Sequence, residues 1–293
     1  MTARTLIRKG DGHRKVREFR SAIPCYLQAL ESDPDNERAL LGLADAYRGA
    51  RLVEEGIAVL ERYLLLKPAD GPVHCRLADA CKRSGKRDLA VTHYHRALAL
   101  EPGNRYALMG LGDFYYKENR HAQALACWEP LLRIDPALVN IQTMVGNIHR
   151  KQLAFGKAAA AFRAVLALEP HNPYAVFGLA DSLRGLGRFE EAVPFWEEIL
   201  KLDPDNLQAL TRAGDCYSRL ARPEKAEELF NRALGRGYDR SALLGLARLH
   251  RQRGQFREGE ACCQAILDRN PADARAAQLR EELARAGKGE TCP

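Results

Sequence analysis

Small and large apolar side chains recur along the chain with a period of 34 residues. In each repeat the eighth position is small: Gly10, Ala44, Ala78, Gly112, Gly146, Ala180, Gly214 and Ala247. The twentieth is also small: Ala22, Gly56, Ala90, Ala124, Ala158, Ala192, Ala226 and Gly259. The twenty-fourth is usually large: Tyr26, Leu60, Tyr94, Trp128, Phe162, Trp196, Phe230 and Cys263. Small residues where two helices cross, next to a bulky one, let an antiparallel helix pair pack closely. The pattern therefore predicts one helix hairpin per repeat.

Prolines mark the same period, at Pro34, Pro68, Pro102, Pro136, Pro170 and Pro204. They divide the chain into eight repeats: 3–36, 37–70, 71–104, 105–138, 139–172, 173–206, 207–239 and 240–273. Most repeats end on a residue that favours a helix N-cap: Asn36, Asp70, Asn104, Asn172, Asn206, Asp239 and Asp273. A fixed period of this length indicates one solenoid, in place of the one to three globular domains that the length alone would allow.

The chain resembles the tetratricopeptide repeat family in its period and in its recurring residues. Leu followed by Gly or Ala stands at positions seven and eight, as in Leu43-Ala44, Leu77-Ala78, Leu111-Gly112 and Leu179-Ala180, and Tyr stands at position eleven in Tyr47, Tyr115 and Tyr217. The resemblance covers about 3–273. It implies an all-α, right-handed superhelical solenoid of about eight hairpins with a concave groove, and a role in binding proteins or peptides. Residues 274–287 have the pattern of a capping helix with a polar outer face, and 288–293 of a flexible tail.

The period is broken in a few places. Gly10 and Gly12 predict a frayed first helix, because glycine is a poor helix former. The joint at 135–140 lacks an N-cap residue, and the joint at 234–240 loses one residue and its proline, so both are candidate flexible points. Pro130 falls inside a second helix and is expected to kink it.

Composition places the chain among folded proteins, with 46% hydrophobic and 28% charged residues and a net charge of +7. The first twelve residues lack an apolar core, which argues against a secretory signal, and no apolar run is long enough to span a membrane. The eight cysteines are scattered, and none forms a CxxC pair. These features predict a cytoplasmic protein with reduced thiols.

Charged residues form two columns on the first helix of each hairpin, which lines the groove in this family. Position nine is mostly acidic and includes Asp45, Asp79, Asp113, Asn147, Asp181 and Asp215. Position twelve is mostly basic and includes Arg48, Lys82, Arg150 and Arg184, with Tyr116 in the fourth repeat. Two interpretations stay open. The columns could form helix-stabilising pairs worth about 0.2–0.5 kcal/mol each, or they could hold an extended peptide backbone.

Two further features concern the same helices. The even repeats place Gly42, Gly110, Gly178 and Gly245 where the odd repeats place Arg8, Arg76, Met144 and Arg212. This alternation indicates either a packing or access requirement or an ancestral duplication. The middle repeats carry aromatic and methionine residues at groove positions: Tyr106, Met109, Tyr116, Met144, Tyr174 and Phe177. Such side chains are favoured at binding hot spots, although neighbouring helices could equally bury them.

Other functions find less support in the sequence. A clamp for a carboxylate tail needs a set of Lys, Asn and Arg residues, of which only Arg76 is in place. No phosphate loop, nucleophile motif or metal-ligand set is present, so we expect no enzyme activity, no cofactor and no metal. The pI of about 9.0 leaves a nucleic-acid-associated role as the alternative. The acidic column argues against it, because carboxylates repel phosphates. The sequence does not determine the oligomeric state.

Overall fold

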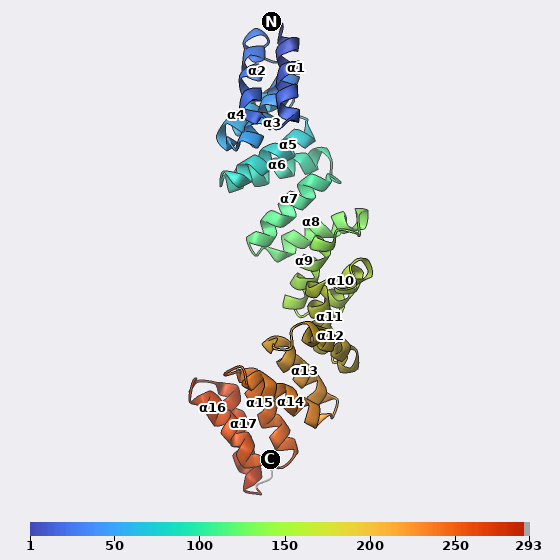
Figure 1. The fold of residues 1–293 in the computed structure, drawn as a ribbon, viewed down its shortest axis with the longest axis vertical. Helices are drawn as coiled ribbons and strands as arrows, with labels where there is room; N and C mark the ends of the chain where they lie inside the picture. Colours follow the sequence, from blue (N-terminus) through green and yellow to red (C-terminus); the bar gives the residue numbers. More distant parts are fainter. Residues whose placement is uncertain (290–293) are drawn as a thin grey trace. The chain divides into compact units, whose positions relative to one another are not determined.

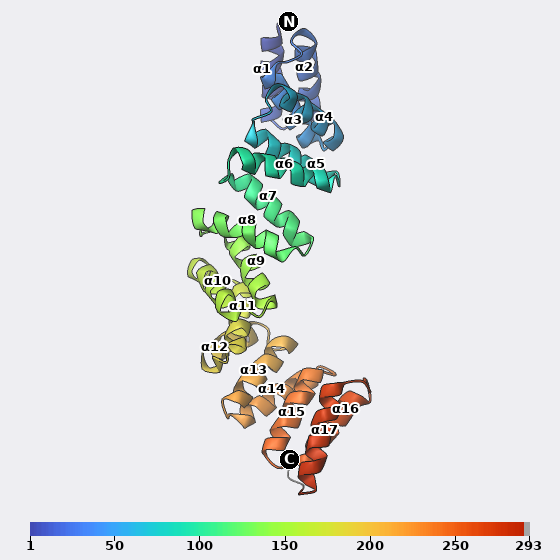
Figure 2. The same ribbon diagram turned by 180° about the vertical axis from the view of Figure 1, so that it is seen from behind.

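The computed structural model describes residues 1–289 and consists there of seventeen α-helices with no strand. Cys292 and most of the predicted tail lie outside the described residues. The chain divides into two compact units, Met1–Asp135 and Pro136–Pro293, each built from helix hairpins that follow one another in chain order (Figures 1 and 2). The repeats that the period predicts are thus divided between two compact units. Their boundary falls in the joint that lacks an N-cap residue.

The N-terminal unit contains the first four hairpins: α1 (Ala3–Lys15) with α2 (Phe19–Ser32), α3 (Glu37–Ala50) with α4 (Val53–Leu66), α5 (Gly71–Arg83) with α6 (Arg87–Leu100), and α7 (Arg105–Lys117) with α8 (His121–Ile134). The C-terminal unit contains the other four and a last helix: α9 (Val139–Lys151) with α10 (Phe155–Leu168), α11 (Pro173–Gly185) with α12 (Phe189–Leu202), α13 (Leu207–Arg219) with α14 (Pro223–Leu234), α15 (Arg240–Gln252) with α16 (Phe256–Leu267), and α17 (Ala274–Gly287). Helix α17 packs on α16 through Leu279 and Leu283.

Side-chain caps set the start of most first helices, as the sequence predicted. Asn36 accepts a hydrogen bond from the Ala39 backbone N–H at 3.0 Å, and Asn104 does the same for Ala107. Asp70, Asn172, Asn206, Asp239 and Asp273 cap their helices in the same way. Each such cap typically stabilises a helix by about 1 kcal/mol. Helix α9 has no side-chain cap, because Leu138 stands at that position.

The core explains the alternation between even and odd repeats. The rings at position twenty-four of the odd repeats are buried, and each lies directly against the glycine at position six of the next repeat. A Cβ built on Gly42 would be 2.5 Å from the Tyr26 ring, and one on Gly110 would be 2.5 Å from the Tyr94 ring. Phe162 and Phe230 lie in the same way against Gly178 and Gly245. At these four joints, a glycine therefore stands where a side chain would clash with a buried ring.

The expected fraying of the first helix is not seen. Helix α1 is continuous from Ala3 to Lys15, with Thr2 as its cap. Its Gly10 is buried against the Tyr26 ring, so this glycine serves the packing that holds the helix in place. Pro130 lies inside α8, where the sequence placed it.

Candidate functional site

The charged columns are joined across repeats, and Asp45 is the clearest case in the N-terminal unit. Its carboxylate accepts hydrogen bonds from Arg14 of α1 at 2.7 Å, from Arg48 of its own helix at 3.1 Å, and from Arg76 of α5. The pair with Arg48 is the predicted contact between positions nine and twelve. The other two come from the preceding and the following repeat. One carboxylate therefore ties together three successive first helices.

Asp181 plays the same role in the C-terminal unit. It accepts from Arg150 of α9 at 2.7 Å and from Arg184 at 2.9 Å, and it pairs with Arg212 of α13. Asp181 is only 5% exposed. Burial alone would raise the pKa of its carboxyl, but the three guanidinium groups outweigh this and hold the pKa below its usual value. Arg184 also reaches Asp215 at 3.2 Å, which extends the network by one repeat.

The columns are not uniform, because lysine and tyrosine replace arginine in the third and fourth repeats. Asp79 accepts a hydrogen bond from the Tyr94 hydroxyl, and no ion pair joins it to Lys82 among the described residues. Asp113 is half-buried and likewise lacks a direct ion-pair partner within 1–289. Burial raises the pKa of the Asp113 carboxyl, and the ammonium groups of Lys82 and Lys117 only partly counteract the rise. In the fifth repeat, Asn147 accepts a long hydrogen bond from Arg150 at 3.4 Å.

The predicted aromatic and methionine positions divide into exposed and packed residues. Tyr106 is 78% exposed and Tyr174 is 72% exposed, whereas Met109 and Met144 are half-buried. Tyr106, Met109 and Tyr116 belong to the N-terminal unit, and Met144, Tyr174 and Phe177 to the C-terminal unit.

Tyr116 and Phe177 instead pack against tryptophans. The Tyr116 ring lies 5.5 Å from the Trp128 ring, centroid to centroid. The Phe177 and Trp196 rings pack edge-on, with their centroids 5.2 Å apart. The Arg212 guanidinium lies 5.0 Å from the centroid of the Phe177 ring. Both residues therefore contribute to packing within their repeats.

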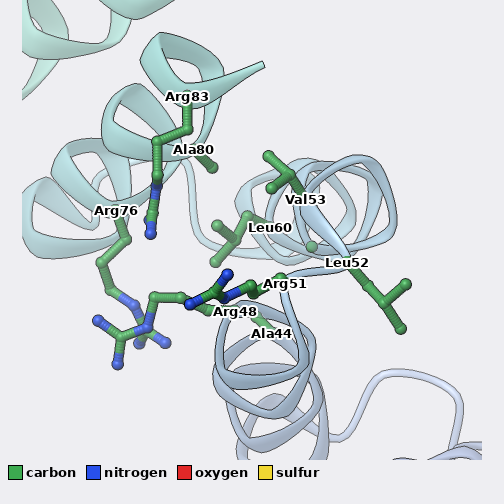
Figure 3. A pocket seen from close by; sticks show the side chains of 10 residues that line it. Ala44, Arg48, Arg51, Leu52, Val53, Leu60, Arg76, Ala80 and Arg83 are labelled. Atoms are coloured by element: carbon green, nitrogen blue, oxygen red, sulfur yellow. The ribbon is translucent and has the colours of Figure 1, made fainter.

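A cavity that the sequence pattern did not predict lies between α3, α4 and α5. Its volume is about 280 Å³, and we call it the arginine cavity. It is lined by Ala44, Arg48, Arg51, Leu52, Val53, Gly56, Leu60, Arg76, Ala80 and Arg83. Figure 3 shows the four guanidinium groups gathered beside Leu60. The signal in the sequence is Leu60 itself, because it stands at a position that is aromatic in most other repeats.

A second cavity, of about 370 Å³, lies in the C-terminal unit and is polar. Its lining includes Asp215 and six arginines: Arg184, Arg212, Arg219, Arg240, Arg248 and Arg275. Arg219, Arg248 and Arg275 form no ion pair with any described residue. Burial and the nearby charges of Arg275 and Arg219 lower the pKa of the Arg248 guanidinium. The cavity therefore carries positive charge that the described chain does not neutralise.

The described residues also limit other chemistry. Across 1–289 no group of three or more His, Cys, Asp or Glu side chains is placed to hold a metal ion. The seven cysteines in that range carry free thiols. No helix there is long and apolar enough to cross a membrane.

Comparison with known proteins identifies the fold. The family model described as tetratricopeptide repeat matches residues 7–72, 75–137 and 144–205, and a second model of that description matches 183–243. The chain belongs to the tetratricopeptide repeat family. The resemblance read from the sequence is thereby confirmed, as is the all-α solenoid class. No curated protein matches this tetratricopeptide repeat chain.

Solved structures with the same fold are distant in sequence. The tetratricopeptide repeat protein YrrB, whose structure shows an unusual peptide-binding site, is 22% identical with a TM-score of 0.57 over 63% of this chain and 95% of that one. A tetratricopeptide repeat protein from Cytophaga hutchinsonii is 15% identical with a TM-score of 0.58, over 93% and 98%. The Naa15/Naa10 structure bound to HypK is 17% identical with a TM-score of 0.60, over 96% of this chain and 44% of that one.

Proposed function

We propose that this protein is a non-catalytic scaffold of the cytoplasm that binds a peptide or protein segment along its first helices. The observation that carries the proposal is the positive charge left without a carboxylate on these helices, at their ends and on the last helix, α17. Arg51 and Arg83 carry it in the N-terminal unit, and Arg219, Arg248 and Arg275 carry it at the second cavity. Charge of this kind attracts an acidic partner and fixes its register.

Two further observations support a protein partner. Tyr106 and Tyr174 expose rings on first helices, and tyrosine is enriched among the residues that dominate binding energy. YrrB, which has the same fold, has a peptide-binding site, and Naa15 is part of a protein complex. A family built from stacked repeats offers extended surfaces suited to such binding.

The test begins by purifying partners of the full chain from its native cell and identifying them by mass spectrometry. Capture of the strongest partner is then compared for the Tyr106→Ala/Tyr174→Ala variant and for a Leu65→Ala/Leu202→Ala control. Leu65 and Leu202 are 84% and 80% exposed but belong to second helices. We expect the tyrosine variant alone to weaken capture, by about tenfold or more. Equal capture by both variants would contradict a role for Tyr106 and Tyr174 in binding.

The alternative is association with nucleic acid, and the arginines of the second cavity favour it. The carboxylates of Asp45 and Asp181 oppose it, because they lie on the same helices that a phosphate backbone would follow. Measuring the binding of generic RNA and DNA at increasing salt separates the two roles. Binding that falls steeply with salt would favour nucleic acid, and no binding at low salt would eliminate it.

A further inference from the structure

Leu60 occupies a position that holds a large aromatic ring in most repeats. Counted from the start of the repeat, Trp128 and Trp196 stand at the same position in the fourth and sixth repeats, and both are fully buried. The arginine cavity opens directly beside Leu60 (Figure 3). The smaller side chain of Leu60 thus leaves space at the place where an indole would otherwise pack.

The sixth and seventh repeats show how this place is filled when tryptophan is present. The Arg212 guanidinium lies 5.9 Å from the centroid of the Trp196 ring. In the N-terminal unit, Arg76 of the third repeat occupies the repeat position that Arg212 occupies in the seventh. Arg76 lines the arginine cavity. Guanidinium groups favour the faces of aromatic rings, and tryptophan is the best partner. The arginine that contacts an indole is therefore kept in the third repeat, while the indole itself is missing from the second.

The charge around the cavity is in excess. Asp45 is the carboxylate that pairs with Arg48 and Arg76, and it is shared with Arg14 as well. Arg51 and Arg83 form no ion pair among the described residues, although Arg83 Nε donates to the Asp79 carbonyl at 3.2 Å. Arginine pairs strongly with carboxylates, because its fork can donate two parallel hydrogen bonds. Arg51 and Arg83 can therefore accept carboxylates, while the apolar lining at Leu60, Val53 and Ala80 accepts an apolar group.

We propose that the arginine cavity binds an aromatic side chain, best an indole, presented by an acidic segment of a partner protein. The ring enters beside Leu60, with Val53 and Ala80 on its walls, and Arg76 contacts its face as Arg212 contacts Trp196. Carboxylates next to the aromatic residue pair with Arg51 and Arg83. This proposal rests on the proposed function, and it specifies the chemistry of the partner segment at the arginine cavity. A base of single-stranded RNA is the competing occupant, and competition between oligouridine and peptide distinguishes the two.

The test uses the capped peptide Gly-Glu-Asp-Trp-Asp-Glu-Gly with a fluorescent label, and follows its anisotropy as full-length protein is added. The decisive variant is Leu60→Trp, which fills the cavity with the residue found in the fourth and sixth repeats and leaves all four arginines in place. We expect this variant to keep its helical circular dichroism and to bind the peptide at least about tenfold more weakly. We expect a similar loss when alanine replaces the tryptophan of the peptide.

Charge is tested separately. Arg51→Gln and Arg83→Gln are expected to weaken binding and reduce its salt dependence, whereas Arg133→Gln, an equal charge change on α8, leaves both unchanged. The proposal is overturned if wild-type protein does not bind the peptide at low salt, if Leu60→Trp binds it equally well, or if unlabelled oligouridine competes better than unlabelled peptide. Capture of the native partner that persists in Leu60→Trp but is lost in Tyr106→Ala/Tyr174→Ala would sink this cavity proposal and leave the scaffold function standing.

Discussion

The ring of Tyr26 lies so close to Gly42 that a methyl group at Gly42 would be 2.5 Å from the Cε1 atom of the ring. Tyr26 is fully buried, and its hydroxyl donates a hydrogen bond to Asp11 at 2.7 Å. The contact joins the second helix of one repeat to the first helix of the next, and it recurs at every second joint. The spacing between these two helices therefore depends on glycine, which has no side chain, at position 42.

Replacing Gly42 with alanine tests this contact. Alanine favours a helix by about 1 kcal/mol over glycine, but overpacking typically costs about 1–3 kcal/mol. We expect Gly42→Ala to lower the free energy of unfolding by about 1 kcal/mol, measured by urea denaturation. Gly12→Ala is the matched control in α1, since a Cβ there meets nothing within 4 Å. It should raise the stability by up to about 1 kcal/mol. The packing explanation fails if both substitutions have the same sign.

The starts of the helices could be predicted from the sequence, because a cap is a local interaction. Asn36 and Ala39 are three residues apart and need no distant partner. The contact between Asp45 and Arg48 could be predicted for the same reason. The pairs of Asp45 with Arg14 and Arg76 could not, because a separation of 31 residues becomes a contact only when the repeats stack.

The candidate site was harder to predict for a similar reason. Tyr106 and Phe177 both stand at expected groove positions, yet Tyr106 is 78% exposed while Phe177 packs on Trp196. Helical spacing gives the direction of a side chain but not the size of its neighbours. The arginine cavity depends on what is missing at Leu60, and a missing side chain becomes visible only when the surrounding residues are in place.

Asp181 should be more sensitive to loss of its charge than Asp215, the next carboxylate of its network. Asp181→Asn leaves Arg150, Arg184 and Arg212 without their shared carboxylate in a buried setting, which typically costs about 3 kcal/mol. Asp215→Asn is the control, because Asp215 is more exposed and, among residues 1–289, forms an ion pair with Arg184 alone. It should cost less than about 1 kcal/mol. Thermal unfolding followed by circular dichroism measures both, and equal losses would contradict a special role for Asp181.

The same network predicts the behaviour in acid. The folded pKa of Asp181 is lowered, so its contribution to stability is complete above the unfolded value, which is about 3.9 for a free aspartate. The contribution is lost as the pH falls through the lower folded pKa. Asp181→Asn should therefore show a smaller loss of melting temperature than the wild type when the pH is taken below 4 in steps of about one unit. Parallel losses in both proteins would refute this assignment.

His74 and His93 form a pair with a defined proton arrangement. Nε2 of His74 lies 3.0 Å from the Pro68 carbonyl oxygen and must donate to it, so Nδ1 of His74 accepts the hydrogen bond from Nδ1 of His93, 3.0 Å away. Burial, followed by the neighbouring His74 and Arg96, lowers the pKa of His93. As the pH falls, His93 is therefore protonated at a higher pH in the unfolded chain than in the folded protein. The stability of the fold consequently falls as the pH drops below about 6.5.

We expect His93→Gln to lose part of that acid sensitivity, seen as a smaller drop in melting temperature between neutral and mildly acidic pH. His171→Gln is the control, because the His171 side chain is 88% exposed. It should follow the wild type over the same range. An unchanged acid response in His93→Gln would show that other groups cause the effect.

Position nine holds Asp or Asn in seven repeats and a positively charged residue, Arg248, in the eighth. The neighbouring guanidinium groups of Arg275 and Arg219 repel that of Arg248. Arg248→Asp restores the residue type of the other repeats and places a carboxylate three residues before Arg251 on α15. Relief of the repulsion together with a new pair should raise the free energy of unfolding by about 1 kcal/mol. Arg248→Gln removes only the repulsion and should give a smaller gain. Added salt should stabilise the wild type more than Arg248→Asp, because it screens the repulsion that the variant lacks. A loss of stability in Arg248→Asp at low salt would mean that the Arg248 stem contributes more by packing than its charge costs.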